Sequence, residues 1–373
     1  MVNCNALGII FPNTYDELIP ELVKHRTMAS VPFGGRYRMI DFCLSGMVNA
    51  GIESVTVIVK KNYHSLMDHL GNGREWDLAR KRGGLNIVPP YAQSSTKVYH
   101  GRVEALYSIL PYLESHREKY VVLSDCNIAS DLDFADLLAK HISSGADVTM
   151  VYERALIPEP LRKDNITFTM NAEGRVTEML INNDRAGVQN LSMNVFVVDR
   201  EALILMVKDA MMRNLVQLER DILARSLSLL HVQGYEYKGY RARVYDMKSY
   251  FDENMRLLAA ENLDALFPAE RPVYTKVRDE APARYAMDCS VKNTLVADGC
   301  LVEGTVENCL LSRGVHICKG AVVKNCVLMQ GTCVEEDAHL DYIVTDKNVL
   351  ITEGKRLAGN ESFPVYVEKD TTV

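Results

Sequence analysis

The last third of the chain repeats itself with a period of 17 residues, and this repeat limits the possible fold more than any other feature of the sequence. Two sets of apolar or small residues keep the step: Val315, Thr332 and Val349, and Ile317, Val334 and Ile351. Within each unit apolar pairs recur at about six residues with glycines between them, which is typical of the three flat sides of a hexapeptide coil. We therefore expect a short left-handed parallel β-helix.

The cysteines and histidines of this segment raise three chemical alternatives: a metal cluster, a disulfide framework and an acyltransferase site. None of the nine cysteines is spaced as CxxC, and six of them fall in the last third: Cys289, Cys300, Cys309, Cys318, Cys326 and Cys333. A metal cluster favours paired spacing and a disulfide framework favours a small secreted domain, so we interpret these thiols as small core residues. Hexapeptide helices also occur in acyltransferases with a histidine base, for which His316 and His339 are the only candidates. The predicted β-helix has few coils and follows a long first part of the chain that would form its own domain. Both features favour a role of the β-helix in packing subunits instead.

Length and composition indicate two domains, since 373 residues are enough for two separate cores. Apolar residues at 47% and charged residues at 24% are ordinary for a soluble globular protein. The net charge of −7 gives no reason to expect nucleic acid or an anionic membrane as partner. No apolar run approaches the roughly 20 residues of a membrane span, and the N-terminus lacks a basic leader with a cleavage site. We therefore expect a cytoplasmic protein.

Ahead of the repeat, residues 31–52 (VPFGGRYRMIDFCLSGMVNAGI) predict the opening crossover of an α/β sheet. A proline and two glycines first build a tight loop or a phosphate-facing turn. Apolar residues then recur at helical spacing as far as Gly51, where a helix would be capped. The apolar run at 55–59 is typical of a buried parallel strand, and residues 5–11 suit the first strand of the same sheet.

The motif PFGG-x-YR-x-IDF-x-LS-x-x-VN-x-GI in this segment resembles the same stretch of ADP-glucose pyrophosphorylases, the bacterial sugar-1-phosphate nucleotidylyltransferases that start glycogen synthesis. Residues 299–334 are similar to the C-terminal domain of the same enzymes, so the resemblance covers nearly the whole chain. It implies an α/β fold with a Rossmann-like, GT-A-like mixed sheet in residues 1–262. A linker would follow in 263–288, and the left-handed β-helix would occupy 289–373.

The resemblance also implies where a catalytic member keeps its chemistry, and the chain departs from the family there. The family's glycine-rich loop closes backbone N–H groups on a triphosphate, whereas residues 13–19 read NTYDELI. Neutral or mismatched side chains hold the other motif positions: Leu18, Met28 and Met179 replace basic residues, and Cys126 and Lys248 replace metal-binding aspartates. A thiol is a poor ligand for Mg²⁺, and an ammonium group repels it. We therefore expect no catalytic residue and no metal site.

The same resemblance also implies which residues are candidates for binding a nucleotide or a metal ion. Gln93 and Gly101 match positions that meet the adenine base and the ribose, and are candidates for residual nucleotide binding. Arg102 and Val103 add bulk beside them, where the family has threonine and alanine. Asp125 could serve as a metal ligand if the loop that follows the central strand is shifted by one residue.

The leading interpretation is a degenerate, regulatory subunit that resembles the GlgD-type subunit of this family and is inactive alone. Its partner would be a catalytic ADP-glucose pyrophosphorylase subunit, in a homo- or hetero-oligomer that the resemblance suggests is a tetramer. No cofactor is expected for this chain, whereas a catalytic homologue would use Mg²⁺. Lys24, His25 and Arg26 are usually a solvated face, and are candidates for binding an anionic effector. The alternatives are an active nucleotidylyltransferase with a rebuilt site and a module that senses sugar phosphates or nucleotides.

Overall fold

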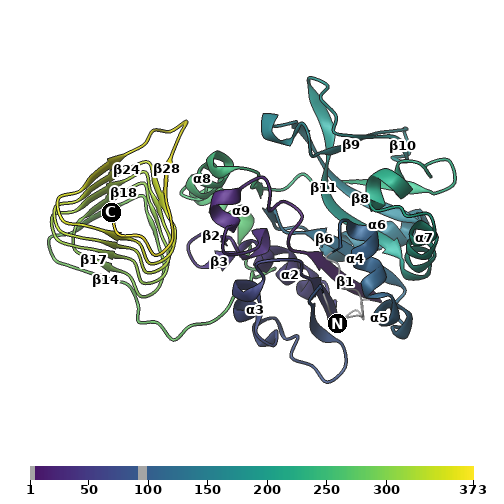
Figure 1. Cartoon of the computed structure of the whole chain (residues 1–373), viewed down its shortest axis with the longest axis horizontal. Coiled ribbons are helices and arrows are strands. Elements are labelled where there is room, and N and C mark those ends of the chain that lie inside the picture. The colour runs from purple at the N-terminus through teal and green to yellow at the C-terminus, as the bar shows by residue number, and fades with distance from the viewer. Residues whose placement is uncertain (1–4, 91–98) are drawn as a thin grey trace.

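The computed structural model describes residues 5–90 and 99–373, and Figure 1 shows a sheet covered by helices beside a coiled stack of short strands. The main sheet contains β1 (Ala6–Phe11), β4 (Ser54–Ile58), β5 (Gly84–Val88), β6 (Tyr120–Asp125), β8 (Val148–Leu156), β9 (Ile166–Met170), β10 (Val176–Ile181), β11 (Val188–Asp199) and β12 (Val232–Glu236). The helices are α1 (Pro20–Val23), α2 (Met39–Asn49), α3 (His64–Leu70), α4 (Arg102–Ser108), α5 (Leu110–Ser115), α6 (Phe134–Ser144), α7 (Arg200–Met212), α8 (Met247–Arg256) and α9 (Ala260–Leu266).

The sheet is mixed, with a parallel centre. Within the described residues its strands run in the order β10-β9-β11-β6-β1-β4-β5. Outside this order, β8 pairs with β11, and β12 pairs with β8. The pairs β6–β1, β1–β4 and β4–β5 are parallel, whereas β11 runs antiparallel to β6. This arrangement confirms the predicted α/β class.

Side-chain alternation along β1 explains why helices cover both faces of the sheet. Leu7 and Ile9 pack with α4, α5 and α7, whereas Ala6 and Ile10 pack with α2, α3 and α6. Successive side chains of a strand point to opposite faces, so a wholly apolar strand needs a cover on each. Gly8 lies where α2 approaches closely, since a Cβ there would be 2.7 Å from Met47 Sδ.

The predicted crossover in residues 31–52 is confirmed, with one change in its opening turn. Gly34 and Gly35 have φ angles of +60° and +82° and join the short strands β2 (Pro32–Phe33) and β3 (Tyr37–Arg38). This hairpin faces the second domain, because a Cβ on Gly35 would lie 3.7 Å from the carbonyl oxygen of Leu311. The two glycines therefore form a structural turn between the domains.

The C-terminal domain is a parallel β-helix of the hexapeptide-repeat type, seen as the stack at the left of Figure 1. One sheet contains β14 (Arg284–Tyr285), β17 (Leu301–Val302), β20 (His316–Ile317), β23 (Cys333–Val334) and β26 (Leu350–Ile351). The second contains β15 (Ser290–Lys292), β18 (Thr305–Glu307), β21 (Val322–Lys324), β24 (His339–Asp341) and β27 (Arg356–Ala358). The third contains β16 (Leu295–Val296), β19 (Leu310–Leu311), β22 (Val327–Leu328), β25 (Ile343–Thr345) and β28 (Val365–Val367).

The register of these strands confirms the 17-residue step, because Ile317 pairs with Val334 and Val334 with Ile351. Both ends of the predicted linker differ in the structure. Helix α9 continues the first domain past residue 262, and β14 already pairs with β17 ahead of residue 289. Proline and charge patterns marked the linker but could not show where the first coil finds its hydrogen-bond partner.

The two domains share a buried interface, with α8, α9 and the β2–β3 hairpin next to the β-helix in Figure 1. Phe251 of α8 packs near Tyr342, with ring centres 6.0 Å apart. Arg26 Nη2 lies 2.6 Å from Asp346 Oδ1, and both side chains are at most 3% exposed. The Tyr366 hydroxyl donates to the same carboxylate over 2.8 Å. An ion pair so fully removed from water fixes the two domains to each other.

Smaller elements complete the described chain. These are the paired strands β7 (Ile128–Ser130) and β13 (Arg241–Arg243) and the short helical turns η1 (Met28–Ser30), η2 (Arg74–Trp76), η3 (Glu159–Leu161) and η4 (Leu218–Leu223). No helix among the described residues combines the length and the apolar character needed to cross a membrane.

Candidate functional site

A polar pocket of about 410 Å³ lies at the carboxyl ends of β1 and β6. In open α/β sheets, ligands bind outside these strand ends. Phe11 and Asp125 are neighbours in the β1–β6 register, and the loop after β1 and the start of α4 border the opening. Its polar rim includes Asn13, Thr14, Glu17, Lys60, Lys61, Lys163, Gln217 and Arg220.

A buried arginine lies at the base of this pocket. Arg102 Nη2 is 2.5 Å from Asp125 Oδ2, and its Nη1 pairs with Glu219. Its guanidinium carbon is 5.1 Å from the ring centre of Phe11 and 5.6 Å from that of Phe196. Burial alone would lower the pKa of Arg102, but the two carboxylates outweigh it and raise that pKa. The guanidinium therefore stays charged and forms an ion pair with each of the two acids.

The carboxylate of Asp125 contacts two residues that line the pocket, Thr14 and Arg102, whereas Cys126 packs into the core. Thr14 Oγ1 donates to Asp125 Oδ1 over 2.9 Å. Burial raises the pKa of Asp125 to about 6 against the attraction of Arg102, so this carboxyl is ionised at neutral pH. Cys126 is 2% exposed, and its Sγ lies 3.7 Å from Cys43 Sγ in the core. The structure therefore brings Asp125, rather than Cys126, to the site.

Polar groups of the loop that follows β1 already have hydrogen-bond partners within the protein. Tyr15 is buried, and its hydroxyl accepts a hydrogen bond from Asn194 Nδ2. The Asp16 carboxylate accepts from Asn13 Nδ2 over 2.7 Å and from the backbone N–H of Met28 over 2.8 Å. The backbone N–H groups of Asp16 and Leu18 donate to carbonyls of the same loop. These groups therefore already have hydrogen-bond partners within the protein. The buried ring of Tyr15 packs under the loop.

The motif positions that sequence reasoning assigned to lost phosphate contacts lie mostly in the core. Met28 is fully buried against the second domain, with Leu18 partly buried at the edge of the same cluster. Met179 is buried on β10 within the cluster under α4 and α7. At these places the side chains contribute to core packing, which stabilises the fold through apolar burial.

The other predicted positions are placed separately. Lys248 lies in the first turn of α8 and pairs with Asp252 one turn along, outside the pocket. Gly101 lines the pocket, where a Cβ would lie only 2.3 Å from the carbonyl oxygen of Val216. Gln93 lies outside the described residues.

A second cleft, of about 40 Å³, lies between the domains and is lined by cations. The β2–β3 hairpin, the interdomain segment and the corners of two coils contribute Arg36, Arg38, Lys276, Arg278, Arg313 and Lys347. Burial, together with the positive charges of Arg38 and Arg26, lowers the pKa of Lys347 to about 7. Three of these cations have carboxylate partners, namely Asp68 for Lys276, Glu280 for Arg278 and Asp298 for Arg313. The remaining excess of positive charge favours binding of an anion.

The predicted basic surface at residues 24–26 is divided by the structure. Lys24 and His25 are exposed and lie next to Glu368, with His25 Nε2 3.8 Å from that carboxylate. Arg26 is not on a solvated face, because it is buried in its pair with Asp346. The correction has a physical reason: α1 packs against the β-helix, which the sequence of α1 alone does not show.

Comparison with known proteins agrees with this architecture. The Nucleotidyl transferase family model matches residues 20–162, and the model named GlmU-like, C-terminal hexapeptide matches residues 280–362. The two parts of the chain thus have the fold of a nucleotidyl transferase and of a hexapeptide β-helix.

Relatives that match over most of their own length identify the protein family more closely. The glycogen biosynthesis protein GlgD of Bacillus subtilis is 33% identical over 99% of this chain and 97% of its own length. GlgD of Geobacillus stearothermophilus is 36% identical over 86% and 84%, respectively. Glucose-1-phosphate adenylyltransferase of Fervidobacterium nodosum is 29% identical over 95% and 85%. The chain belongs to the family of the glycogen biosynthesis protein GlgD.

Sequence reasoning missed the partners that make the pocket unusual. It treated Arg102 as added bulk and did not find its pairing with Glu219, which lies 117 residues further along the chain. An arginine replacing threonine beside an apolar helix face was the available signal, because a buried guanidinium requires carboxylates. The cationic cleft carried no local signal, since its basic residues come from four separate segments.

Proposed function

We propose that this chain is a regulatory, catalytically inactive subunit that assembles with a catalytic glucose-1-phosphate adenylyltransferase in glycogen synthesis. The assembly would convert ATP and glucose 1-phosphate into ADP-glucose and pyrophosphate. This chain would stabilise the catalytic partner and set its response to effectors. The proposal places both chains in the cytoplasm as a tetramer.

The observation that carries the proposal is the buried ion-paired set of Arg102, Asp125 and Glu219. Mg²⁺ is held in proteins by one or two carboxylates together with substrate phosphates. Here the guanidinium already pairs with both acids, and a divalent ion would have to displace it and leave it buried without a partner. The residues at this site therefore do not fit Mg²⁺.

Loss of the charged groups accounts for the proposed lack of activity. Each preorganised group that stabilises transferring phosphate is commonly worth about 2.7–4 kcal/mol in the transition state. Such contributions are not additive, but losing several at once leaves little measurable chemistry. The Nucleotidyl transferase fold would then serve as a scaffold for assembly.

A regulatory role has its own support in the cationic cleft. Arg36 of the first domain and Lys347 of the β-helix both line this cleft, so an anion held there would contact both domains. The phosphate group of a sugar phosphate or a nucleotide has the required charge, and a cleft of about 40 Å³ would hold that group while the rest of the ligand stays outside. A ligand binding one arrangement of the domains more tightly would shift the population toward it. This observation also favours the second candidate function, a sensor of sugar phosphates or nucleotides without a catalytic partner.

Pyrophosphate release tests the proposal directly. The purified chain, a catalytic glucose-1-phosphate adenylyltransferase and their mixture would each receive ATP, glucose 1-phosphate and Mg²⁺. We expect no turnover by this chain alone and a changed kcat or KM for the mixture. Turnover by the lone chain that Asp125→Asn removes would overturn the proposal in favour of an active enzyme with a rebuilt site.

Calorimetry separates the two candidate functions. Fructose phosphates, ATP and ADP-glucose would be titrated into the chain and into Arg36→Ala, a variant of the cleft outside the ion-paired set. Binding that the substitution weakens, without any effect on a catalytic homologue, would support the sensor. An effect on the homologue that the bound anion alters would support the regulatory subunit.

A further inference from the structure

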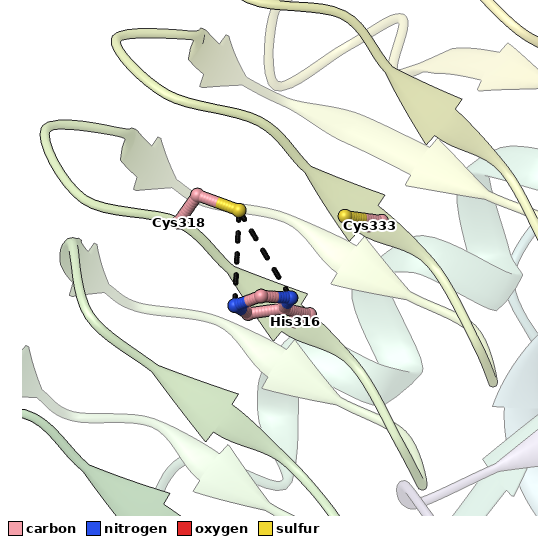
Figure 2. A group of neighbouring side chains, drawn as sticks. All are labelled: His316, Cys318 and Cys333. Atoms are coloured by element: carbon pink, nitrogen blue, oxygen red, sulfur yellow. Dashed lines mark hydrogen bonds between the residues drawn. The ribbon is translucent and has the colours of Figure 1, made fainter.

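On the outer face of the β-helix, the side chains of His316, Cys318 and Cys333 gather at one point (Figure 2). Each offers one ligand atom, and these atoms all lie within 4.8 Å of one another. Among the described residues, no other group of three or more histidine, cysteine or acidic side chains meets that condition. The cluster lies apart from both the pocket and the cationic cleft.

The coil geometry explains why this cluster forms without a CxxC motif. His316 in β20 and Cys333 in β23 are direct partners in a parallel ladder, although they are 17 residues apart. Adjacent strands lie about 4.8 Å apart, and residues i and i+2 of one strand share a face. Cys318 therefore lies on the same outer face as His316 and reaches toward both. All three residues are partly exposed, so an ion can reach them.

The distances fit a tetrahedral ion with small adjustments. Cys318 Sγ is 3.7 Å from His316 Nε2 and 4.0 Å from Nδ1. Zinc bonds of about 2.3 Å to sulfur and about 2.0–2.1 Å to nitrogen place these two atoms about 3.6 Å apart in a tetrahedron. A movement of about 0.4 Å would bring Cys318 Sγ and His316 Nδ1 to this separation, and the Cys333 Sγ already lies within 4.8 Å of the other two ligand atoms.

A carboxylate orients the imidazole. His316 Nε2 lies 3.0 Å from Glu303 Oε2, and Glu303 comes from the preceding coil. With the Nε2 proton donated to Glu303, Nδ1 has its lone pair free for a metal. Histidine ligands of metals almost always donate their other N–H in this way.

The chemistry of the ligand atoms also favours a metal ion. Thiols bind a metal ion as thiolates, so binding at this cluster would release protons. Two thiolates and an imidazole are soft ligands that select Zn²⁺ over Mg²⁺.

We propose that this face of the β-helix binds one Zn²⁺ through Cys318 Sγ, Cys333 Sγ and His316 Nδ1, with Glu303 as the positioning residue. Water takes the fourth position, on the solvent side. Because the ligands come from adjacent coils, the ion links these coils through side chains in addition to the backbone ladder. The site stands independently of the regulatory role proposed above.

Zinc binding to the reduced, chelator-treated full chain tests the proposal. Zn²⁺ would be titrated in competition with a chromophoric chelator, and Co²⁺ would report thiolate coordination by its charge-transfer absorption. We expect one tight site per chain, lost in Cys318→Ser and in Cys333→Ser. Glu303→Gln should weaken binding about 10–100-fold, as substitution of outer-shell partners typically does. Cys289→Ser, a partly exposed cysteine outside the cluster, is the matched control and should bind as the parent does.

Site-resolved alkylation keeps the test decisive if a variant folds poorly. In the parent chain, Zn²⁺ should slow the alkylation of Cys318 and Cys333 and leave that of Cys289 unchanged. Equal zinc affinity of the parent and Cys318→Ser would overturn the assignment. So would recovery of a Cys318–Cys333 disulfide, unaffected by zinc, from the chain purified without reductant.

Discussion

Replacing Arg102 with methionine tests whether the pocket depends on its internal ion pairs. Methionine keeps most of the apolar length that packs near Phe11 and Phe196 but removes the charge. Asp125 and Glu219 would then be buried acids without their cation. Breaking a buried pair in this way costs about 3–5 kcal/mol, which is a large part of the roughly 5–15 kcal/mol that stabilises a domain.

Urea unfolding followed by tryptophan fluorescence measures this loss. Trp76 is the single tryptophan of the chain and is buried in the first domain, so its signal reports that domain. We expect the free energy of unfolding to fall by about 3–5 kcal/mol in Arg102→Met. Adding Asp125→Asn and Glu219→Gln removes the unpaired charges, and the triple variant should recover most of the loss.

The pH dependence supplies a separate check. Burial already raises the pKa of Asp125 to about 6 from 3.8, and loss of the arginine would raise it further. The folded variant then binds more protons than the unfolded chain between these values, so its stability increases as the pH falls from 7 toward about 4. A loss below about 1 kcal/mol at pH 7, or one that does not shrink in acid, would refute the electrostatic account.

Three further predictions address other parts of the molecule. Arg26→Ala should cost about 3–5 kcal/mol, because Asp346 is left buried and unpaired, and should speed proteolysis between the domains; unchanged unfolding and proteolysis would contradict this. Binding of inorganic phosphate in the cationic cleft should raise the pKa of Lys347 above about 7, so calorimetry at pH 8 in two buffers should detect proton uptake that Lys347→Met removes. Gly101→Ala should lower stability by about 1–3 kcal/mol, measured by thermal unfolding, since its Cβ would meet the Val216 carbonyl oxygen at 2.3 Å.

Periodic features of the sequence predicted the fold well, for a physical reason. The 17-residue step fixes which residues stack in neighbouring coils, and the structure pairs Ile317 with Val334 as that step requires. The helical spacing of apolar residues after the PFGG motif likewise predicted α2 correctly, and Gly51 has a φ of +82° just beyond the end of that helix. Local patterns and packing agree in these segments, so sequence alone was sufficient.

The site was harder to predict because it depends on register and on distant partners. A shift of one residue at the end of β6 exchanges Cys126 for Asp125, since neighbouring side chains face opposite sides. The pairing of Arg102 with Glu219 joins elements whose proximity no local pattern reveals. The half-buried Cys318 and Cys333 were expected in the core, although the same coil period already placed Cys333 beside His316.

The pair that joins Arg26 to Asp346 has a consequence for biosynthesis. Arg26 leaves the ribosome 320 residues before its acid, so the first domain can fold while that charge still has no partner. Docking of α1 is completed only when the late coils, with Tyr366 on β28, have been made. A prematurely terminated chain would therefore expose the surface around Arg26 that the late coils cover in the finished protein. Cellular proteases would recognise this exposed surface and so distinguish an unfinished chain from a finished one.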